Sequence, residues 1–274
     1  MVISQARPTE KGFGSLWRIH WPSPRLATRV WRRNVTLYRR SWKLTFLPQF
    51  LQPVFYLIAI GYGLGSLIGR EIQGFEYVEY IAPGLAASAA MNAAAFELTF
   101  NVFGKFSWSR LYESVITTPL EPEDVALGEI MWGVTRAVLY GAVFFAVMLG
   151  LGHIRQPYAP LAFVAFALTG LAVGLVALMF TGFITDMDYF SYFFNLFLIP
   201  LFLFSGIFFE IDLMPYPARV IAWLTPLHHG VEMTRAATLT GDVGAILGHG
   251  LWLSVFSLLL FLPTINLFRR KLII

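Results

Sequence analysis

The sequence has no cysteine and little charge. Only 13% of its 274 residues are charged, about half of the roughly 25% that soluble domains carry. The lack of cysteine excludes a disulfide framework, thiolate metal sites and a cysteine nucleophile. Hydrophobic residues make up 57% of the chain, and its mean hydropathy is +0.65. A soluble core of this size cannot hide so much apolar surface, so we expect most of the chain to lie in lipid.

Six long apolar runs predict an all-α integral membrane protein with six transmembrane helices. Each run has about 21–25 residues, enough to cross ~30 Å of hydrocarbon at ~1.5 Å per residue. Segments in lipid must satisfy their own backbone hydrogen bonds, and the alternating pattern of a membrane barrel is absent. We expect Pro200 to kink the fifth span. The predicted spans are Leu47–Gly69, Tyr80–Phe103, Val125–Leu149, Ala159–Phe180, Tyr189–Phe209 and Ala245–Phe268.

The distribution of lysine and arginine predicts the orientation. With both termini inside, the inside segments carry 15 of these residues and the outside segments carry 4. We therefore expect both termini to be cytoplasmic. The first apolar run begins only near Leu47, too late for a cleavable signal peptide. We divide the chain into a cytoplasmic N-terminal region, 1–46, and one transmembrane domain, 47–274.

The segment before the first span has the pattern of an amphipathic helix. Trp31, Val35, Tyr38 and Trp42 fall on one side of a helical wheel. The other side is basic and includes Arg29, Arg32, Arg33, Arg39, Arg40 and Lys43. This pattern predicts a helix in the cytoplasmic membrane interface, with its aromatic rings at headgroup depth. It serves as a topological anchor, as a lever touching a cytoplasmic partner, or as both. The aromatic face and the span that follows argue against nucleic-acid binding.

No motif in the chain indicates an enzyme. The sequence contains no phosphate loop, no H-E-x-x-H zinc motif and no G-x-S-x-G nucleophile elbow. Three ionisable residues lie inside the predicted spans: Glu97, Glu129 and Arg136. Each costs about 2.5–3.5 kcal/mol at mid-bilayer. Because spans two and three are antiparallel, Glu97 and Arg136 reach a similar depth, which predicts a structural ion pair. A proton relay or a substrate site is the alternative.

Small residues recur at helical spacing. Gly61, Gly65 and Gly69 are four residues apart, as are Gly170 and Gly174, and span two is rich in alanine. Such stripes allow helices to approach closely. The stripes are explained either by packing within one chain or by a homodimer interface.

Two loops are longer than plain connections need. The cytoplasmic loop Gly104–Asp124 contains a predicted short helix, Ser109–Thr118, ended by Pro119 and Pro122 and suited to docking. The outside segment Glu210–Asp242 is long but apolar, and it predicts two short helices on or dipping into the outer leaflet. Its adjacent histidines are a poor metal site because neighbouring side chains on a helix diverge, so we predict no metal. The residues that we select in this segment are Trp223, Pro226, His228, His229, Glu232 and Arg235.

The order of short motifs along the chain resembles the type-2 ABC exporter permeases, including those of rhizobial nodulation-factor export and their drug-exporter-like relatives. The resemblance covers nearly the whole chain. The motifs that carry it are Tyr80-Ile81-Ala82-Pro83-Gly84, Phe96-Glu97, Tyr112-Glu113-Ser114 through Thr118-Pro119-Leu120, Gly128-Glu129-Ile130, Asp188-Tyr189-Phe190, Ser205-Gly206-Ile207-Phe208-Phe209 and Trp223-Leu224-Thr225-Pro226-Leu227-His228-His229-Gly230-Val231-Glu232 with Arg235.

The resemblance implies a permease homodimer that works with two copies of an ATPase subunit in the bacterial inner membrane. ATP and Mg²⁺ are then bound by the partner, and this chain needs no cofactor. It also implies an interface helix around Leu26–Lys43 and re-entrant helices within Met214–Leu239. The substrates of the family are lipid-linked glycans, lipo-oligosaccharides, polysaccharides or amphiphilic drugs.

The resemblance further places the loop helix Ser109–Thr118 against the ATPase. Tyr112 and Ile116 share one face of that helix, with Leu111 beside them, and we predict that this face is exposed to the partner. The full set of predicted coupling residues is Arg110, Leu111, Tyr112, Glu113, Ile116 and Thr118. The alternative is that these side chains pack against the permease itself.

Two other classes of protein remain open on the residues alone. A secondary transporter driven by an ion gradient is one, although it usually needs more ionisable groups near mid-bilayer. A membrane-embedded enzyme that acts on lipid is the other, but the sequence contains no recognisable catalytic cluster.

Overall fold

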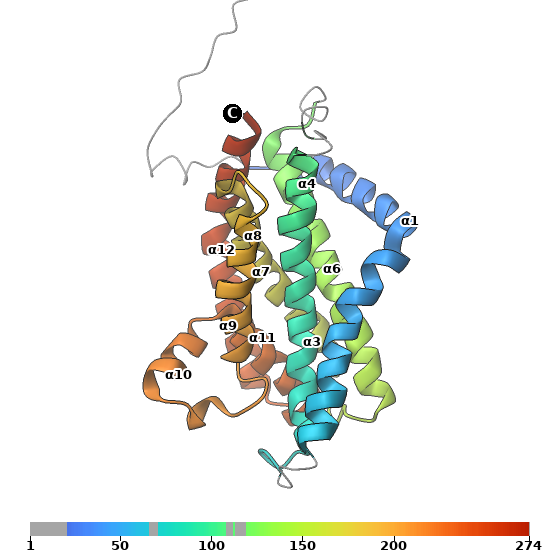
Figure 1. The fold of residues 1–274 in the computed structure, drawn as a ribbon, viewed down its shortest axis with the longest axis vertical. Helices are drawn as coiled ribbons and strands as arrows, with labels where there is room; N and C mark the ends of the chain where they lie inside the picture. The colour runs from blue at the N-terminus through green and yellow to red at the C-terminus, as the bar shows by residue number, and fades with distance from the viewer. Residues whose placement is uncertain (1–20, 66–70, 108–111, 113–118, 274) are drawn as a thin grey trace, which may run out of the picture.

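The computed structural model describes residues 21–65, 71–107, 112 and 119–273 (Figure 1). These residues form a bundle of helices. Apart from one isolated bridge between Ile72 and Phe75, the described part of the chain contains no β-structure. The prediction of an all-α protein is therefore confirmed for these residues.

The helical segments follow one another through most of the described chain. In order they are α1 (Pro24–Tyr56), η2 (Leu57–Leu64), α3 (Tyr77–Phe96), η3 (Glu97–Asn101), α4 (Val102–Ser107), α6 (Pro122–Gly150), η4 (Ala159–Leu161), α7 (Ala162–Phe183), α8 (Tyr189–Tyr192), η5 (Phe193–Leu198), α9 (Ile199–Leu203), η6 (Ile211–Leu213), α10 (Tyr216–Trp223), α11 (Pro226–Arg235), η7 (Ala236–Thr240) and α12 (Val243–Ile273).

Three helical segments of the described chain are long and apolar enough to cross a membrane. They are Pro122–Gly150, Ala159–Phe183 and Val243–Leu272, and they correspond to the predicted third, fourth and sixth spans. Two shorter apolar segments, Val54–Gly63 and Tyr189–Leu203, correspond to the first and fifth. The predicted second span, Tyr80–Phe103, lies within the helical run formed by α3, η3 and α4.

Helix α1 contains both the predicted interface helix and the start of the predicted first span. The helical run from Pro24 through η2 is continuous, so the predicted boundary between residues 46 and 47 falls inside it. The first part of α1 lies across one end of the bundle, and the chain then turns to run beside α3 (Figure 1). We call this end, where α4 and the C-terminal end of α12 also lie, the α1 end.

The predicted fifth span is shorter than the sequence suggests. Its helix ends at Leu203, and residues 204–209 form turns in which Gly206 has a φ of +81°. A left-handed residue of this kind ends a helix, because the right-handed backbone cannot continue through it. The helix from Tyr189 to Leu203 is about 22 Å long, less than the ~30 Å of a bilayer core. The prediction of a helix up to Phe209 is therefore wrong.

Three glycines of the small-residue stripes, Gly61, Gly170 and Gly174, pack closely against neighbouring helices of the same chain. A Cβ added to Gly170 of α7 would lie 2.3 Å from the Cβ of Ala137 in α6. One added to Gly174 would lie 2.7 Å from Leu98 Cδ1, on the helical run that continues α3. Gly61 faces α3 in the same way. Of the two readings of these glycines, the structure supports close packing between the helices of one chain.

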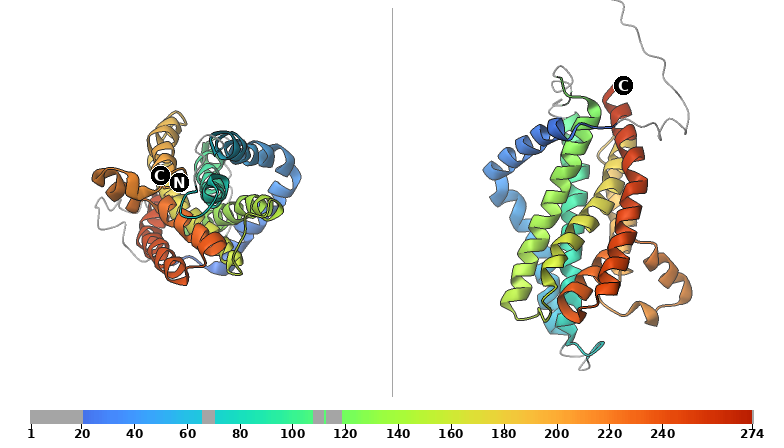
Figure 2. Two further views of the ribbon diagram at one scale, coloured as in Figure 1. Left: turned by 90° about the horizontal axis from the view of Figure 1, so that it is seen from below. Right: turned by 180° about the vertical axis from the view of Figure 1, so that it is seen from behind.

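Two short helices precede the last helix, as predicted. They are α10 and α11, and both lie toward the end of the bundle opposite the α1 end, which we call the α10 end (Figures 1 and 2). Helix α11 is buried against α3, α7 and α12, whereas much of α10 is exposed. The left-handed Gly241, with a φ of +72°, ends this unit before α12 begins.

Candidate functional site

Helix α1 is docked on α6 at the α1 end. A Cβ added to Gly128 of α6 would lie 2.6 Å from the Cβ of Val30 and 2.8 Å from the carbonyl oxygen of Ala27. Only glycine lets the two backbones come this close. The indole Nε1 of Trp31 also donates a hydrogen bond of 2.9 Å to Thr135 Oγ1 of α6. These contacts hold α1 at a fixed position on the bundle.

The two sides of α1 have different environments. Trp42 is 46% exposed, but Trp31 and Tyr38 are half-buried, and Tyr38 packs edge-on against Trp132 of α6. This face of the helix therefore packs on α6, and the position of the aromatic rings at headgroup depth stays a prediction. The opposite side is basic as predicted, with Arg29, Arg32, Arg39 and Arg40 exposed and Arg33 half-buried.

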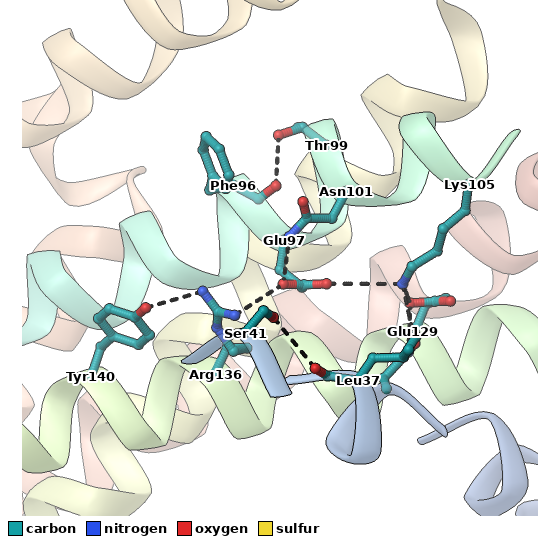
Figure 3. A network of polar contacts seen from close by, with 11 residues as sticks. Leu37, Ser41, Phe96, Glu97, Thr99, Asn101, Lys105, Glu129, Arg136 and Tyr140 are labelled. Atoms are coloured by element: carbon teal, nitrogen blue, oxygen red, sulfur yellow. Dashed lines mark hydrogen bonds and ion pairs between the residues drawn. The ribbon is translucent and has the colours of Figure 1, made fainter. Parts of the chain in front are cut away.

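Glu97 and Arg136 form the predicted ion pair. Arg136 Nη1 lies 3.5 Å from Glu97 Oε2, and the two side chains are 3% and 4% exposed. Arg136 Nη2 donates a hydrogen bond of 3.1 Å to the hydroxyl of Tyr140, and the guanidinium lies 4.5 Å from the centre of the Tyr38 ring. Figure 3 shows Arg136 between Glu97 and Tyr140. The pair joins α6 to the helical run that continues α3, and Tyr38 of α1 covers it.

Lys105 and Glu129 extend this pair into a cluster of four charges. Lys105 Nζ lies 2.6 Å from Glu129 Oε2 and 3.9 Å from Glu97 Oε1 (Figure 3). Each of the two carboxylates is paired with a cation, which reduces the cost of burying the cluster. Lys105 is not among the residues predicted from the sequence. Its spacing from Glu97 could have indicated this contact, because Glu97, Asn101 and Lys105 are four residues apart and share one helical face.

Glu129 accepts hydrogen bonds from three further parts of the chain. Its Oε2 accepts from Asn34 Nδ2 of α1 at 2.9 Å, as well as from Lys105 of α4. Its Oε1 accepts from the hydroxyl of Tyr112 at 3.0 Å. Glu129 is 0% exposed, so the whole carboxylate depends on these protein donors.

Tyr112 does not lie where the sequence analysis expected it. Its side chain is 2% exposed, and its ring packs 4.6 Å from Phe106 and 5.7 Å from Phe268, measured between ring centres. The prediction that Tyr112 is exposed to a partner is therefore wrong, because its hydroxyl satisfies a buried carboxylate. The other predicted coupling residues lie outside the described residues; they are Arg110, Leu111, Glu113, Ile116 and Thr118.

A second polar group lies at the α10 end and centres on Arg235 of α11. Its side chain is buried, and Nη2 donates a hydrogen bond of 2.9 Å to the carbonyl oxygen of Gly206. The guanidinium lies 3.9 Å from the centre of the Tyr80 ring, and Nη1 donates to the carboxylate of Glu232. Arg235 thus holds the turn that ends the fifth predicted span against α3 and α11.

The two predicted histidines lie beside this group. His229 Nε2 is 2.8 Å from the carbonyl oxygen of Trp223, and its Nδ1 is 2.8 Å from His249 Nδ1 on α12. A carbonyl oxygen only accepts, so Nε2 of His229 carries a proton; in the neutral ring Nδ1 then accepts from His249. His228 Nδ1 donates to the carbonyl oxygen of Ser205 at 3.3 Å. The histidines therefore join α10, α11 and α12.

Burial keeps the ring of His229 neutral. It lowers the pKa of His229 from 6.5 to about 4, because the charged imidazolium loses its hydration in this position.

Pro226 occupies the first turn of α11, where its missing N–H costs nothing. Among the residues that the structure describes, no group of three or more His, Asp or Glu side chains could hold a metal ion.

The described chain is a bundle of helices, three of which are long and apolar enough to cross a membrane. The family model for ABC-2 type transporters matches residues 26–239. The chain therefore belongs to the ABC-2 type transporter family, whose members are transmembrane permeases.

Three of the curated relatives that resemble the chain cover most of its length. Nodulation protein J of Sinorhizobium fredii is 32% identical over 244 residues, which are 89% of this chain and 93% of that protein. Nodulation protein J of Bradyrhizobium diazoefficiens is 32% identical over 246 residues, or 90% of this chain and 94% of that protein. The inner membrane transport permease YadH of Escherichia coli is 24% identical over 242 residues, or 88% and 93% of the two chains.

Proposed function

We propose that this chain is the membrane-spanning permease subunit of an ATP-binding-cassette exporter. It moves an amphiphilic substrate, such as a lipid-linked glycan, a lipo-oligosaccharide or a drug-like molecule, across the bacterial inner membrane. Membership of the ABC-2 type transporter family carries this proposal. The names of the relatives, nodulation protein J and inner membrane transport permease, agree with it. ATP and Mg²⁺ bind to a separate ATPase subunit, because this sequence lacks a phosphate loop.

In this proposal the chain has six spans, with both termini and the α1 end in the cytoplasm. The excess of lysine and arginine in the corresponding segments supports this orientation. The α10 end then faces outward, and α10 and α11 are the outer re-entrant helices. Helix α1 lies in the cytoplasmic interface, where its exposed arginines meet lipid headgroups.

The working assembly contains two copies of this chain and two ATPase subunits. The ATPase docks at the α1 end, against the first cytoplasmic loop. ATP binding draws the ATPase subunits together and moves these loops, which switches the substrate pathway between the permease copies from one accessible side to the other. This is a shift between two conformations that the ATPase binds with different affinity.

Co-purification tests this proposal directly. The chain is expressed together with each ATP-binding-cassette ATPase encoded near its gene, extracted in mild detergent and isolated through a tag on the permease. We expect one ATPase to be retained and the complex to hydrolyse ATP. A chain that isolates as a monomer and never retains an ATPase would contradict the proposal. Transport that survives ATP depletion but stops with an uncoupler would instead favour a secondary transporter.

A further inference from the structure

The carboxylate of Glu129 connects three segments that are distant in the sequence. Its donors are Asn34 of α1 at 2.9 Å, Lys105 of α4 at 2.6 Å and Tyr112 at 3.0 Å. Glu129 itself lies on α6, next to Gly128, the residue that allows α1 to approach. One buried side chain therefore relates the position of α1 to that of Tyr112.

Such a carboxylate holds its donors firmly. Hydrogen bonds to an ionised group are roughly twice as strong as neutral ones. A buried carboxylate that loses a donor cannot turn to water for a replacement, so each lost bond is costly. Asn34 adds to the constraint, because its Oδ1 accepts from Lys105 Nζ at 3.3 Å while its Nδ2 donates to Glu129. Movement of α1 relative to Tyr112 breaks at least one of these contacts.

We propose that Glu129 is a positioning residue that makes helix α1 and Tyr112 move as one unit, by accepting hydrogen bonds from Asn34 and Tyr112 at the same time. The sequence around Tyr112 belongs to the loop that the proposed function assigns to the ATPase, and to that extent the inference rests on the proposed function. Its consequence is that a push on this loop also displaces the interface helix. The Tyr112 hydroxyl is then a coupling contact inside the permease.

A purely stabilising role is the alternative, and a pair of matched variants separates the two. Tyr112→Phe removes the hydroxyl but keeps the ring that packs between Phe106 and Phe268. Tyr140→Phe is the control, because Tyr140 is equally buried and its hydroxyl belongs to the same cluster through Arg136. Tyr140 lies on α6, and its hydroxyl also bonds Tyr38 of α1, so this variant removes a contact of α1 but leaves the bridge from Asn34 through Glu129 to Tyr112 in place. Both variants should lower the melting temperature by similar amounts.

The first measurement needs no ATPase. The sequence has no cysteine, so Thr36→Cys on α1 and Pro119→Cys after the loop give two exposed spin-label sites on the full chain in lipid nanodiscs. We expect Tyr112→Phe and Glu129→Gln to broaden the distance distribution between the labels clearly. Tyr140→Phe should leave its width unchanged. Equal widths in all variants, or equal broadening by Tyr112→Phe and Tyr140→Phe, would overturn the inference.

The second measurement uses the complex with the ATPase. At equal complex yield, Tyr112→Phe should change the rate of ATP hydrolysis by up to about tenfold. The variant lacks the hydrogen bond to the charged Glu129 that favours one position of Tyr112 relative to α1. Combining it with Glu129→Gln should add less than the sum of the two separate effects, because both changes weaken the same hydrogen bond. Additive effects would contradict the inference. If the wild-type chain binds no ATPase, the proposed function fails, while the label distances still decide whether Glu129 links α1 to Tyr112.

Discussion

Arg136 Nη1 lies 3.5 Å from Glu97 Oε2 in a cluster that also pairs Lys105 with Glu129. Removing Arg136 leaves the buried Glu97 without its guanidinium partner. We expect Arg136→Met to lower the free energy of unfolding by about 3 kcal/mol, measured by denaturant titration in detergent. Changing both Glu97 and Arg136 to Met should recover much of this loss, because Lys105 and Glu129 remain paired. A double variant less stable than either single variant would show that the pair is not the stabilising unit.

The docking of α1 depends on the absence of a side chain at Gly128. In Gly128→Ala the new methyl carbon would lie 2.6 Å from Val30 Cβ, a distance that real contacts do not reach. We expect a loss of stability of about 1–3 kcal/mol, as in other overpacked sites, together with faster proteolysis within α1. Gly248→Ala is the control, since its methyl would meet nothing within 4 Å. Equal proteolysis in both variants would argue against close docking of α1.

Arg235 is held by a geometry that lysine cannot reproduce. Its guanidinium donates to the carbonyl of Gly206 and to Glu232 while lying 3.9 Å from the centre of the Tyr80 ring. Arg235→Lys keeps the charge but loses the planar fork, and we expect it to cost about 2 kcal/mol of stability. Arg219→Lys should change stability by less than about 0.5 kcal/mol, because Arg219 pairs with the exposed Asp212. Thermal unfolding of the two purified variants checks this. Similar melting temperatures would contradict the role given to Arg235.

The buried His229 predicts a loss of stability in acid. Its pKa is lowered from 6.5 to about 4, so below pH 6.5 the unfolded chain takes up a proton that the folded chain does not. The stability that is complete above pH 6.5 should therefore fall as the pH is lowered toward 4. In His229→Gln, which cannot titrate, the dependence over this range should be weaker. A wild-type protein with the same melting temperature at pH 7.5 and pH 5 would contradict the burial of a neutral His229.

Much of the architecture follows from local properties of the sequence. Apolar runs of span length, with a proline and acidic residues at the start of α6, set the helices because lipid leaves the backbone no other way to satisfy its hydrogen bonds. The depth of Glu97 and Arg136 on antiparallel spans was enough to predict their pairing. The two short helices before α12 also followed from prolines and an apolar pattern between them.

Tertiary structure decided the contacts that depend on how α1 packs. Wheel geometry assigned Trp31 and Tyr38 to one apolar face correctly, but it could not say whether lipid or α6 covers that face. Beyond the early end of the fifth helix, Arg235 from another helix donates to the carbonyl of the left-handed Gly206, a contact that no local pattern predicted. Tyr112 was expected outside because its local pattern suited exposure, yet a buried carboxylate on α6 requires its hydroxyl. The sequence alone determined that three helical segments are long and apolar enough to cross a membrane, because this property depends on each segment's own length and hydropathy. The convergence of Asn34, Lys105 and Tyr112 on Glu129 depends on the relative placement of four segments, which only the packed bundle sets.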